Sequence, residues 1–272
     1  MRPSAEPGSS SKPPAKTPSK RNRLCFAPRR RTKTDAISHE VAPTCFRQAS
    51  TLCETESMSS ALPALIFDLD GTLTDSKPGI VGCLRKALDA WHIFDPGPLD
   101  RFVGPPVEEW TVELLPDGSQ DDRVRLARDY RACYDREGWK NNSVFAGVRE
   151  MLAELGKIGH PLYVCTSKQQ HFAVRILDLF ELTSQFTAIY GDKAEYASHS
   201  KVDLLANLVS EHSLSPRITW MIGDRIYDIQ AAQANQIRCL AAGWGYGSAG
   251  EYAQADALAG APADVAVLVR PV

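Results

Sequence analysis

Short apolar runs alternate with helix-period segments over most of the chain after Met58, and this alternation restricts the possible folds more than any other feature. Each run has the length of a buried strand, and the segments between them place apolar residues on one helix face. The pattern is typical of a mostly parallel sheet with crossover helices, so it predicts a Rossmann-like α/β fold with helices on both faces. The predicted strands are residues 64–70, 161–166, 187–191, 218–223, 237–241 and 263–268.

One segment breaks this alternation, because residues 78–146 contain helical and turn patterns but no convincing strand. An insertion after the first strand predicts an α-helical cap over the carboxyl ends of the strands, where open α/β sheets bind ligands. The chain therefore divides into a core of residues 58–77 and 147–272 and a cap of residues 78–146. We expect the core to carry the chemistry and the cap to select the substrate.

The first 57 residues differ in composition from the remainder. They contain eleven Lys and Arg, five Asp and Glu, and seven of the 18 prolines. Their formal charge is therefore +6, and the remainder carries −8 because the whole chain carries −2. Such a segment buries too little apolar surface to offset its ordering entropy, so we predict a disordered basic tail. A translation start near Met58 and a targeting peptide are the alternatives, although the prolines would break a targeting helix.

Charge, hydropathy and cysteine spacing limit the partners and the compartment. The net charge of −2 favours neither nucleic acid nor a membrane surface as the main partner. The sequence contains no run of eighteen consecutive apolar residues, so we expect no transmembrane helix. The seven cysteines show no paired spacing of a zinc site or a disulfide framework. We therefore expect buried reduced thiols in a cytoplasmic protein, which would be a monomer or a homodimer.

The strongest chemical signal is the run LIFDLDGTLTDS at residues 65–76, where a buried strand ends at two aspartates. Side chains two positions apart lie on the same side of a strand, so Asp68 and Asp70 should both reach the carboxyl edge of the sheet. Their mutual repulsion calls for a cation, and Mg²⁺ suits hard oxygen ligands beside a phosphate. An acidic turn is the simpler interpretation, but a charge directly after three apolar residues is costly without a partner.

Two later segments offer groups that suit a phosphate. In YVCTSK, residues 163–168, Thr166 can donate to a phosphate oxygen and, with Ser167 and the main-chain N–H groups that follow, form an anion site at a helix N-terminus. A helix cap by Thr166 or Ser167 is the alternative. Lys201 opens a predicted helix at 201–214, where a cation is unfavourable unless an anion lies nearby. Lys168 and Lys193 compete for the same role.

A fourth segment, MIGDRIYD at residues 221–228, again ends a strand in Gly-Asp. Asp224 would join the metal site, and Asp228 would support it through hydrogen bonds or water. A strand end followed by a helix cap is the alternative for each segment alone. Four strand ends in order, each with a group suited to phosphate and a divalent cation, favour the functional interpretation.

In this order the four segments resemble the motifs of the haloacid dehalogenase superfamily, which are D-x-D-G-T, a Thr or Ser, a Lys, and G-D-x-x-x-D. The chain is more specifically similar to the phosphoglycolate phosphatase-like branch with a helical cap, through FVGPP at residues 102–106 and YRACYDREG at residues 130–138. The resemblance covers residues from about 62 to the end. Residues 197–200 depart from it, because related sequences tend to have a basic residue shortly before the Lys of the third motif.

The resemblance implies roles for the residues of the first three motifs. Asp68 would be the nucleophile, and Asp70 would act first as general acid and then as general base. Thr72 would help to place Asp70. The residues that hold the phosphoryl group would be Thr166, Ser167 and Lys201.

The resemblance also implies a metal site and a substrate-facing part of the cap. Asp68, Asp70 through its main-chain carbonyl, and Asp224 would bind Mg²⁺, with Asp228 behind them. The cap residues that face the substrate would be Gly104, Pro105 and Arg131.

The leading hypothesis is a Mg²⁺-dependent phosphatase that hydrolyses a small phosphorylated metabolite, such as phosphoglycolate, through an aspartyl-phosphate. A general acid at Asp70 serves an alkoxide leaving group, whereas a halide needs no proton, so dehalogenation fits poorly. The alternatives are a 5'-nucleotidase, a sugar-phosphate phosphatase, a phosphoryl-transferring mutase, and a catalytically silent module whose basic tail recruits an acidic partner.

Overall fold

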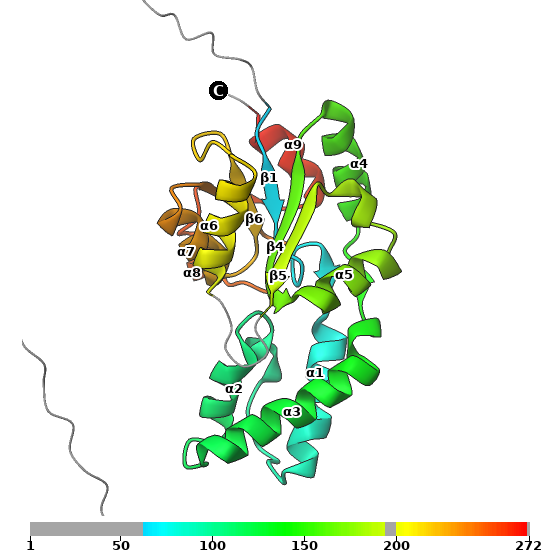
Figure 1. Cartoon of the computed structure of the whole chain (residues 1–272), viewed down its shortest axis with the longest axis vertical. Helices are drawn as coiled ribbons and strands as arrows, with labels where there is room; N and C mark the ends of the chain where they lie inside the picture. The colour runs from blue at the N-terminus through cyan, green and yellow to red at the C-terminus, as the bar shows by residue number, and fades with distance from the viewer. Residues whose placement is uncertain (1–61, 194–199, 271–272) are drawn as a thin grey trace, which may run out of the picture. The chain divides into compact units, whose positions relative to one another are not determined.

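The computed structural model describes residues 62–193 and 200–270, so the tail predicted at residues 1–57 lies outside the described part of the chain. Six strands form one sheet in the order β5-β4-β1-β6-β7-β8, and every neighbouring pair is parallel. Figure 1 labels β5, β4, β1 and β6 of this sheet. The prediction of a Rossmann-like parallel sheet is confirmed. The strands are Leu65–Phe67 (β1), Leu162–Gln169 (β4), Ala188–Asp192 (β5), Trp220–Gly223 (β6), Arg238–Ala242 (β7) and Ala257–Ala259 (β8).

The central strand β1 shows why both faces of the sheet carry helices. Its three apolar side chains are fully buried, and alternate residues point to opposite faces. Leu65 and Phe67 belong to an apolar cluster with α4 (Val148–Ile158), α5 (Gln170–Leu179) and α9 (Val265–Leu268). Ile66 belongs to a second cluster with α6 (Lys201–Glu211) and α7 (Ile226–Ala234), on the opposite side in Figure 1. The predicted two-sided arrangement is therefore confirmed.

The predicted strand at residues 263–268 is wrong. Most of this segment forms a short 3-10 helix, Pro262–Asp264, and then α9, whereas the sixth strand is β8, which follows the short helix α8 (Ala249–Tyr252). Val265 and Val269 are buried while Val267 is 59% exposed, which is the spacing of a helix face. A short apolar run does not by itself distinguish a buried strand from a buried helix.

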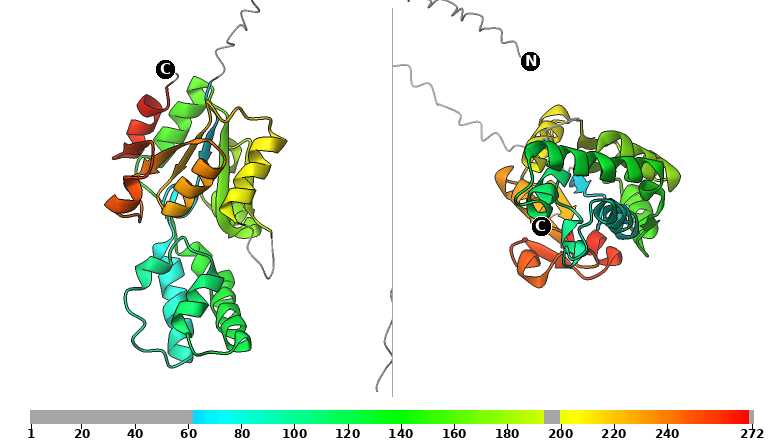
Figure 2. Two further views of the ribbon diagram at one scale, coloured as in Figure 1. Left: turned by 90° about the vertical axis from the view of Figure 1, so that its left-hand side faces the viewer. Right: turned by 90° about the horizontal axis from the view of Figure 1, so that it is seen from below.

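The cap is bracketed by two short strands, β2 (Thr74–Asp75) and β3 (Ser143–Val144), which pair in antiparallel register. Figure 2 shows the cap helices beyond the carboxyl ends of the parallel strands. A two-residue strand has no periodic signal, which explains why the sequence does not predict β3. The elements between the two strands are α1 (Lys77–Ala90), a 3-10 helix (Leu99–Phe102), α2 (Val107–Leu114), α3 (Gln120–Arg136) and a second 3-10 helix (Gly138–Lys140).

None of the helices within residues 62–193 and 200–270 has the length and apolar character needed to cross a membrane.

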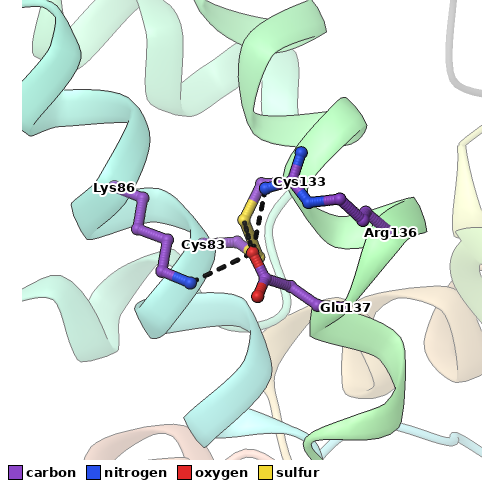
Figure 3. The surroundings of a disulfide bond; sticks show 5 residues. All are labelled: Cys83, Lys86, Cys133, Arg136 and Glu137. Carbon is purple, nitrogen blue, oxygen red and sulfur yellow. Dashed lines mark hydrogen bonds and ion pairs between the residues drawn. A yellow bond between two sulfur atoms is a disulfide. The ribbon is translucent and has the colours of Figure 1, made fainter.

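A disulfide joins Cys83 of α1 to Cys133 of α3, with the two Cα atoms 5.5 Å apart (Figure 3). The expectation of reduced thiols without a disulfide is wrong for this pair, whereas Cys165 and Cys239 are free and buried as expected. The bonded cysteines are separated by 50 residues and lie in different helices, so no short spacing marks them in the sequence.

Cys83→Ala should lower the midpoint of thermal unfolding by about 5–10 °C, because the disulfide restricts the unfolded chain by up to about 4 kcal/mol of conformational free energy. Circular dichroism of the oxidised and reduced protein measures this. The reductant should shift the wild-type midpoint and leave that of Cys83→Ala unchanged. A matched Cys239→Ala variant, which removes a free core thiol, should keep the response to reductant. A wild-type midpoint that ignores the reductant would contradict the prediction.

Candidate active site

Three neighbouring strands bring the predicted site residues to one edge of the sheet. β1 lies between β4 and β6. Asp68 follows β1, Thr166 lies near the end of β4, and Asp224 follows β6. Because these strands are parallel, their carboxyl ends meet at the same edge. Lys201, the first residue of α6, reaches this edge from the helix side.

Lys201 occupies the centre of the site between two carboxylates. Its Nζ lies 2.8 Å from Asp68 Oδ1 and 2.5 Å from Asp228 Oδ1. All three side chains are at least nine-tenths buried. Burial disfavours the charged ammonium, but the charges of Asp228 and Asp68 outweigh it and raise the pKa of Lys201. Lys201 is therefore a fixed cation beside the predicted nucleophile.

Three buried carboxylates form a candidate metal centre. Oxygens of Asp68, Asp224 and Asp228 lie within 4.8 Å of one another. Burial, together with the charges of Asp228 and Asp68, raises the pKa of Asp224 well above its usual value, and burial raises the pKa of Asp228 to about 6 against the opposing charge of Lys201. One ammonium does not balance three carboxylates, so the site has excess negative charge. Hard oxygen donors with this excess fit Mg²⁺.

Asp224 is held in this cluster by contacts far apart in the sequence. The main-chain N–H of Tyr246 donates to Asp224 Oδ2 at 2.8 Å, and the Thr72 hydroxyl donates to Asp224 Oδ1 at 3.2 Å. Gly71 has a φ of +87°, and a Cβ atom there would lie 2.2 Å from Asp224 Oδ2. The glycine of the first motif is therefore required for the close approach of the two motif loops.

The positions of three predicted residues differ from the expected ones. The carboxylate of Asp228 lies within the acidic cluster rather than behind it. The Asp70 carboxylate pairs with Lys168 and lies outside the acidic cluster, so the cation that its repulsion with Asp68 calls for is Lys168, while its main-chain carbonyl stays a predicted metal ligand. Thr72 contacts Asp224 and so positions a cluster carboxylate instead of Asp70. These differences arise because strand alternation determines the face of the sheet to which a side chain points, but not the residue that it contacts.

Lys168 and Tyr134 form a second buried network around Asp70. Lys168 Nζ lies 2.8 Å from Asp70 Oδ2 and donates to the Tyr134 hydroxyl of α3 at 2.9 Å. Burial disfavours the Lys168 charge, but Asp70 outweighs it and raises the pKa of Lys168. Among the described residues, Asp70 Oδ1 has no hydrogen-bond partner, which suits a group that exchanges protons with a ligand. The sequence offers Lys168 only as an alternative to Lys201 and gives no role to Tyr134.

Thr166 and Ser167 line a small cavity together with Asp68, Lys201 and Asp228. Thr166 Oγ1 accepts a hydrogen bond from the main-chain N–H of Lys168 at 3.3 Å, so its own hydrogen can be donated to a ligand. Helix α5 begins only at Gln170. The predicted anion site at a helix N-terminus directly after Thr166 is therefore wrong, and the two hydroxyls remain as the donors of this segment.

A second cavity extends from Asp70 and Lys168 towards the cap, and the predicted substrate-facing residues Gly104, Pro105 and Arg131 all line it. Arg131 forms an ion pair with Glu108, which lines the same cavity. Four aromatic residues without an assigned role in the sequence motifs add an apolar wall. They are Trp110, Tyr130, Tyr134 and Phe172, with successive ring centroids 4.8, 5.8 and 5.1 Å apart.

Residues 65–242 match the model of a family described as haloacid dehalogenase-like hydrolase. The chain belongs to this family. The match begins at β1 and ends with β7, so it contains all four motif segments and the cap.

Three named proteins show how similar this haloacid dehalogenase-like hydrolase is to known sequences. The chain is 41% identical over 189 residues to a protein named tyrosine-protein kinase PtkA from Mycobacterium tuberculosis, covering 68% of this chain but only 63% of the relative. It is 35% identical over 192 residues to a 5'-nucleotidase from Pseudomonas aeruginosa, covering 70% of this chain and 86% of the relative. It is 28% identical over 201 residues to a phosphoglycolate phosphatase from Photobacterium profundum, covering 67% and 83%. The resemblance to the phosphoglycolate phosphatase-like branch is thus confirmed.

The fold of this haloacid dehalogenase-like hydrolase also agrees with that of a solved structure. The family protein SP0104 from Streptococcus pneumoniae is similar with a TM-score of 0.70 and 29% sequence identity, covering 77% of this chain and 99% of that protein.

Proposed function

We propose that this haloacid dehalogenase-like hydrolase is a Mg²⁺-dependent phosphatase that hydrolyses a small phosphomonoester. The observation that carries the proposal is the buried contact of Lys201 with both Asp68 and Asp228, beside Asp224 and next to a cavity lined by two hydroxyl residues. A nucleophilic carboxylate next to a fixed cation is what phosphoryl transfer through a covalent intermediate requires.

Asp68 and Asp70 divide the reaction into two steps. In the first step, a carboxylate oxygen of Asp68 attacks phosphorus, and the departing alkoxide takes a proton from Asp70. In the second step, Asp70 takes a proton from water while the water oxygen attacks phosphorus, which releases inorganic phosphate and restores Asp68. The same carboxyl group thus gives up a proton and regains it within one cycle.

The remaining site residues stabilise charge on the phosphoryl oxygens. Lys201 supplies an ammonium, and the hydroxyls of Thr166 and Ser167 supply hydrogen bonds, within a buried site where such contacts are strong. When bound by Asp68, Asp224, Asp228 and the main-chain carbonyl of Asp70, Mg²⁺ would add positive charge for the same oxygens.

Two substrate classes have support from the cap. Phosphoglycolate is favoured by Arg131, a cation in the cap cavity with which a small carboxylate can pair. A nucleoside 5'-monophosphate is favoured by the aromatic wall of Trp110, Tyr130, Tyr134 and Phe172, because a planar base can pack against rings. Sugar phosphates have no comparable support in the lining residues.

Release of inorganic phosphate from a panel of metabolites tests the proposal. The panel contains phosphoglycolate, 5'-nucleoside monophosphates, sugar phosphates and p-nitrophenyl phosphate. We expect turnover of at least one phosphomonoester with Mg²⁺ and none above background after removal of the metal with EDTA. Readdition of Mg²⁺ should restore the rate and serves as the control. No turnover on the whole panel would favour the silent binding module.

The proposal also covers partner, assembly and location. The partner is a small phosphorylated metabolite rather than nucleic acid or membrane, which agrees with the charge of −8 outside the first 57 residues. The enzyme acts in the cytoplasm as a monomer or a homodimer. Cytoplasmic thiols reduce most disulfides, so the state of Cys83 and Cys133 in cells tests the location.

A further inference from the structure

Arg225 lies at the junction of the phosphoryl cavity and the cap. It stands between Asp224 and Asp228 in the fourth motif and lines the small cavity that also contains Asp68 and Lys201. Only 15% of its side chain is exposed. Its position in the pattern G-D-x-x-x-D accepts any residue, so the sequence motif predicts no role for it.

The guanidinium of Arg225 crosses from the core to the cap. It donates to the main-chain carbonyl of Val103, which is 122 residues away in the chain. Gly104 makes room for this contact, since its φ is +107° and a Cβ atom there would lie 3.3 Å from both Cγ and Nη1 of Arg225. Arg225 therefore holds the start of the cap segment 103–106, which we call the cap loop.

Glu251 holds the guanidinium of Arg225 in place. Its Oε1 lies 3.1 Å from Arg225 Nε and also accepts the main-chain N–H of Ile226 at 3.1 Å, while Oε2 accepts that of Ser248 at 2.8 Å. The Glu251 carboxylate has little conformational freedom, because two main-chain N–H groups donate to it and its side chain is 81% buried. Arg225 is thus aligned before any ligand binds.

The cap loop borders both cavities. Gly104 lines the phosphoryl cavity and the cap cavity, and Pro105 lines the latter. The main-chain carbonyl of Pro105 accepts a hydrogen bond from Trp110 Nε1 at 3.0 Å, so the loop also contacts the first residue of the aromatic wall. A shift of this loop would move the surface that the leaving group contacts relative to Asp68.

We propose that Arg225 is a positioning residue that holds the cap loop over the phosphoryl site and so aligns the leaving group with Asp68, with Glu251 as its support. This role rests on the proposed phosphatase function. Arg225 acts through the loop, and therefore it affects substrates with a leaving group and not the binding of inorganic phosphate alone.

The test compares Arg225→Met with the wild type in two measurements, the KM of the best substrate in the panel and the inhibition constant of inorganic phosphate. Loss of charge-assisted hydrogen bonds should raise KM about 10- to 100-fold, while the inhibition constant of phosphate changes less than about twofold. If both constants rise together, Arg225 is a direct phosphate ligand and the proposal is overturned. If neither changes, the proposal is also overturned.

Three further variants make the result specific. Arg225→Lys keeps the charge but cannot contact Glu251 and Val103 with a planar fork, so it should not restore KM. Glu251→Gln should raise KM in the same direction and provides the answer if Arg225→Met does not fold. Arg175→Met is the matched control, because Arg175 also links the core to the cap, at 2.8 Å from Asp135, but through a solvent-exposed pair. It should leave KM unchanged.

Amide hydrogen exchange separates failure of this proposal from failure of the proposed function. Without any substrate, the amides of Val103 and Gly104 should exchange faster in Arg225→Met than in the wild type and in Arg175→Met. An enzyme that is inactive on the whole panel but shows this difference retains the loop contact and lacks the assigned activity. Equal exchange in all three proteins would overturn the role of Arg225.

Discussion

Asp68→Asn should lower kcat by a factor on the order of 10⁴ or more on whichever substrate the panel identifies, because the amide is a poor nucleophile for phosphorus. The substitution preserves the size of the side chain, so the cavity that it lines with Lys201 is unchanged in shape. Steady-state phosphate release measures the effect. Asp203→Asn, an exposed aspartate in the first turn of the same helix as Lys201, should keep wild-type turnover.

The stability of Asp68→Asn distinguishes loss of chemistry from loss of fold. Asp68 is one of three buried carboxylates within 4.8 Å, and its removal relieves repulsion while Lys201 keeps its contact with Asp228. The thermal midpoint in the absence of Mg²⁺ should therefore be equal to or higher than that of the wild type. An inactive variant with a normal midpoint supports the nucleophile assignment. Turnover within tenfold of the wild type would refute it.

The convergence of the site was predictable because it depends on short local patterns. An apolar run followed by Asp predicts a buried strand with a polar end, and parallel strands in one sheet must deliver those ends to one edge. Asp68, Thr166 and Asp224 meet at that edge for this reason alone. No knowledge of any distant side-chain contact is needed for this part of the prediction.

The individual partners were not predictable, because they join residues far apart in the chain. Thr72 and Asp224 are 152 residues apart, and Arg225 and Val103 are 122 apart. Periodicity states which side of an element a residue occupies, whereas these contacts depend on how the motif loops and the cap pack. The Cys83–Cys133 disulfide was not predicted for the same reason, because the two helices that carry these cysteines come together only in the folded cap.

Lys201→Met should reduce both activity and stability by large amounts. The side chain keeps its length and loses the cation that contacts Asp68 and Asp228. We expect kcat to fall on the order of 10³-fold, because charge on the phosphoryl oxygens loses a fixed cation in a buried site. We expect the free energy of unfolding without Mg²⁺ to fall by about 3–5 kcal/mol, since buried carboxylates lose their partner. Lys193→Met, at an exposed lysine, is the matched control and should change neither quantity.

A double variant separates the two effects of Lys201. In Lys201→Met/Asp228→Asn, one negative charge is removed together with the positive one, so most of the lost stability should return in denaturant unfolding. Activity should not return, because restoring the charge balance among the carboxylates does not restore a cation at the phosphoryl oxygens. If the second substitution also recovered turnover, Lys201 would act only by neutralising Asp228. If it recovered neither quantity, the buried contact between Lys201 and Asp228 would not be what stabilises this edge of the sheet.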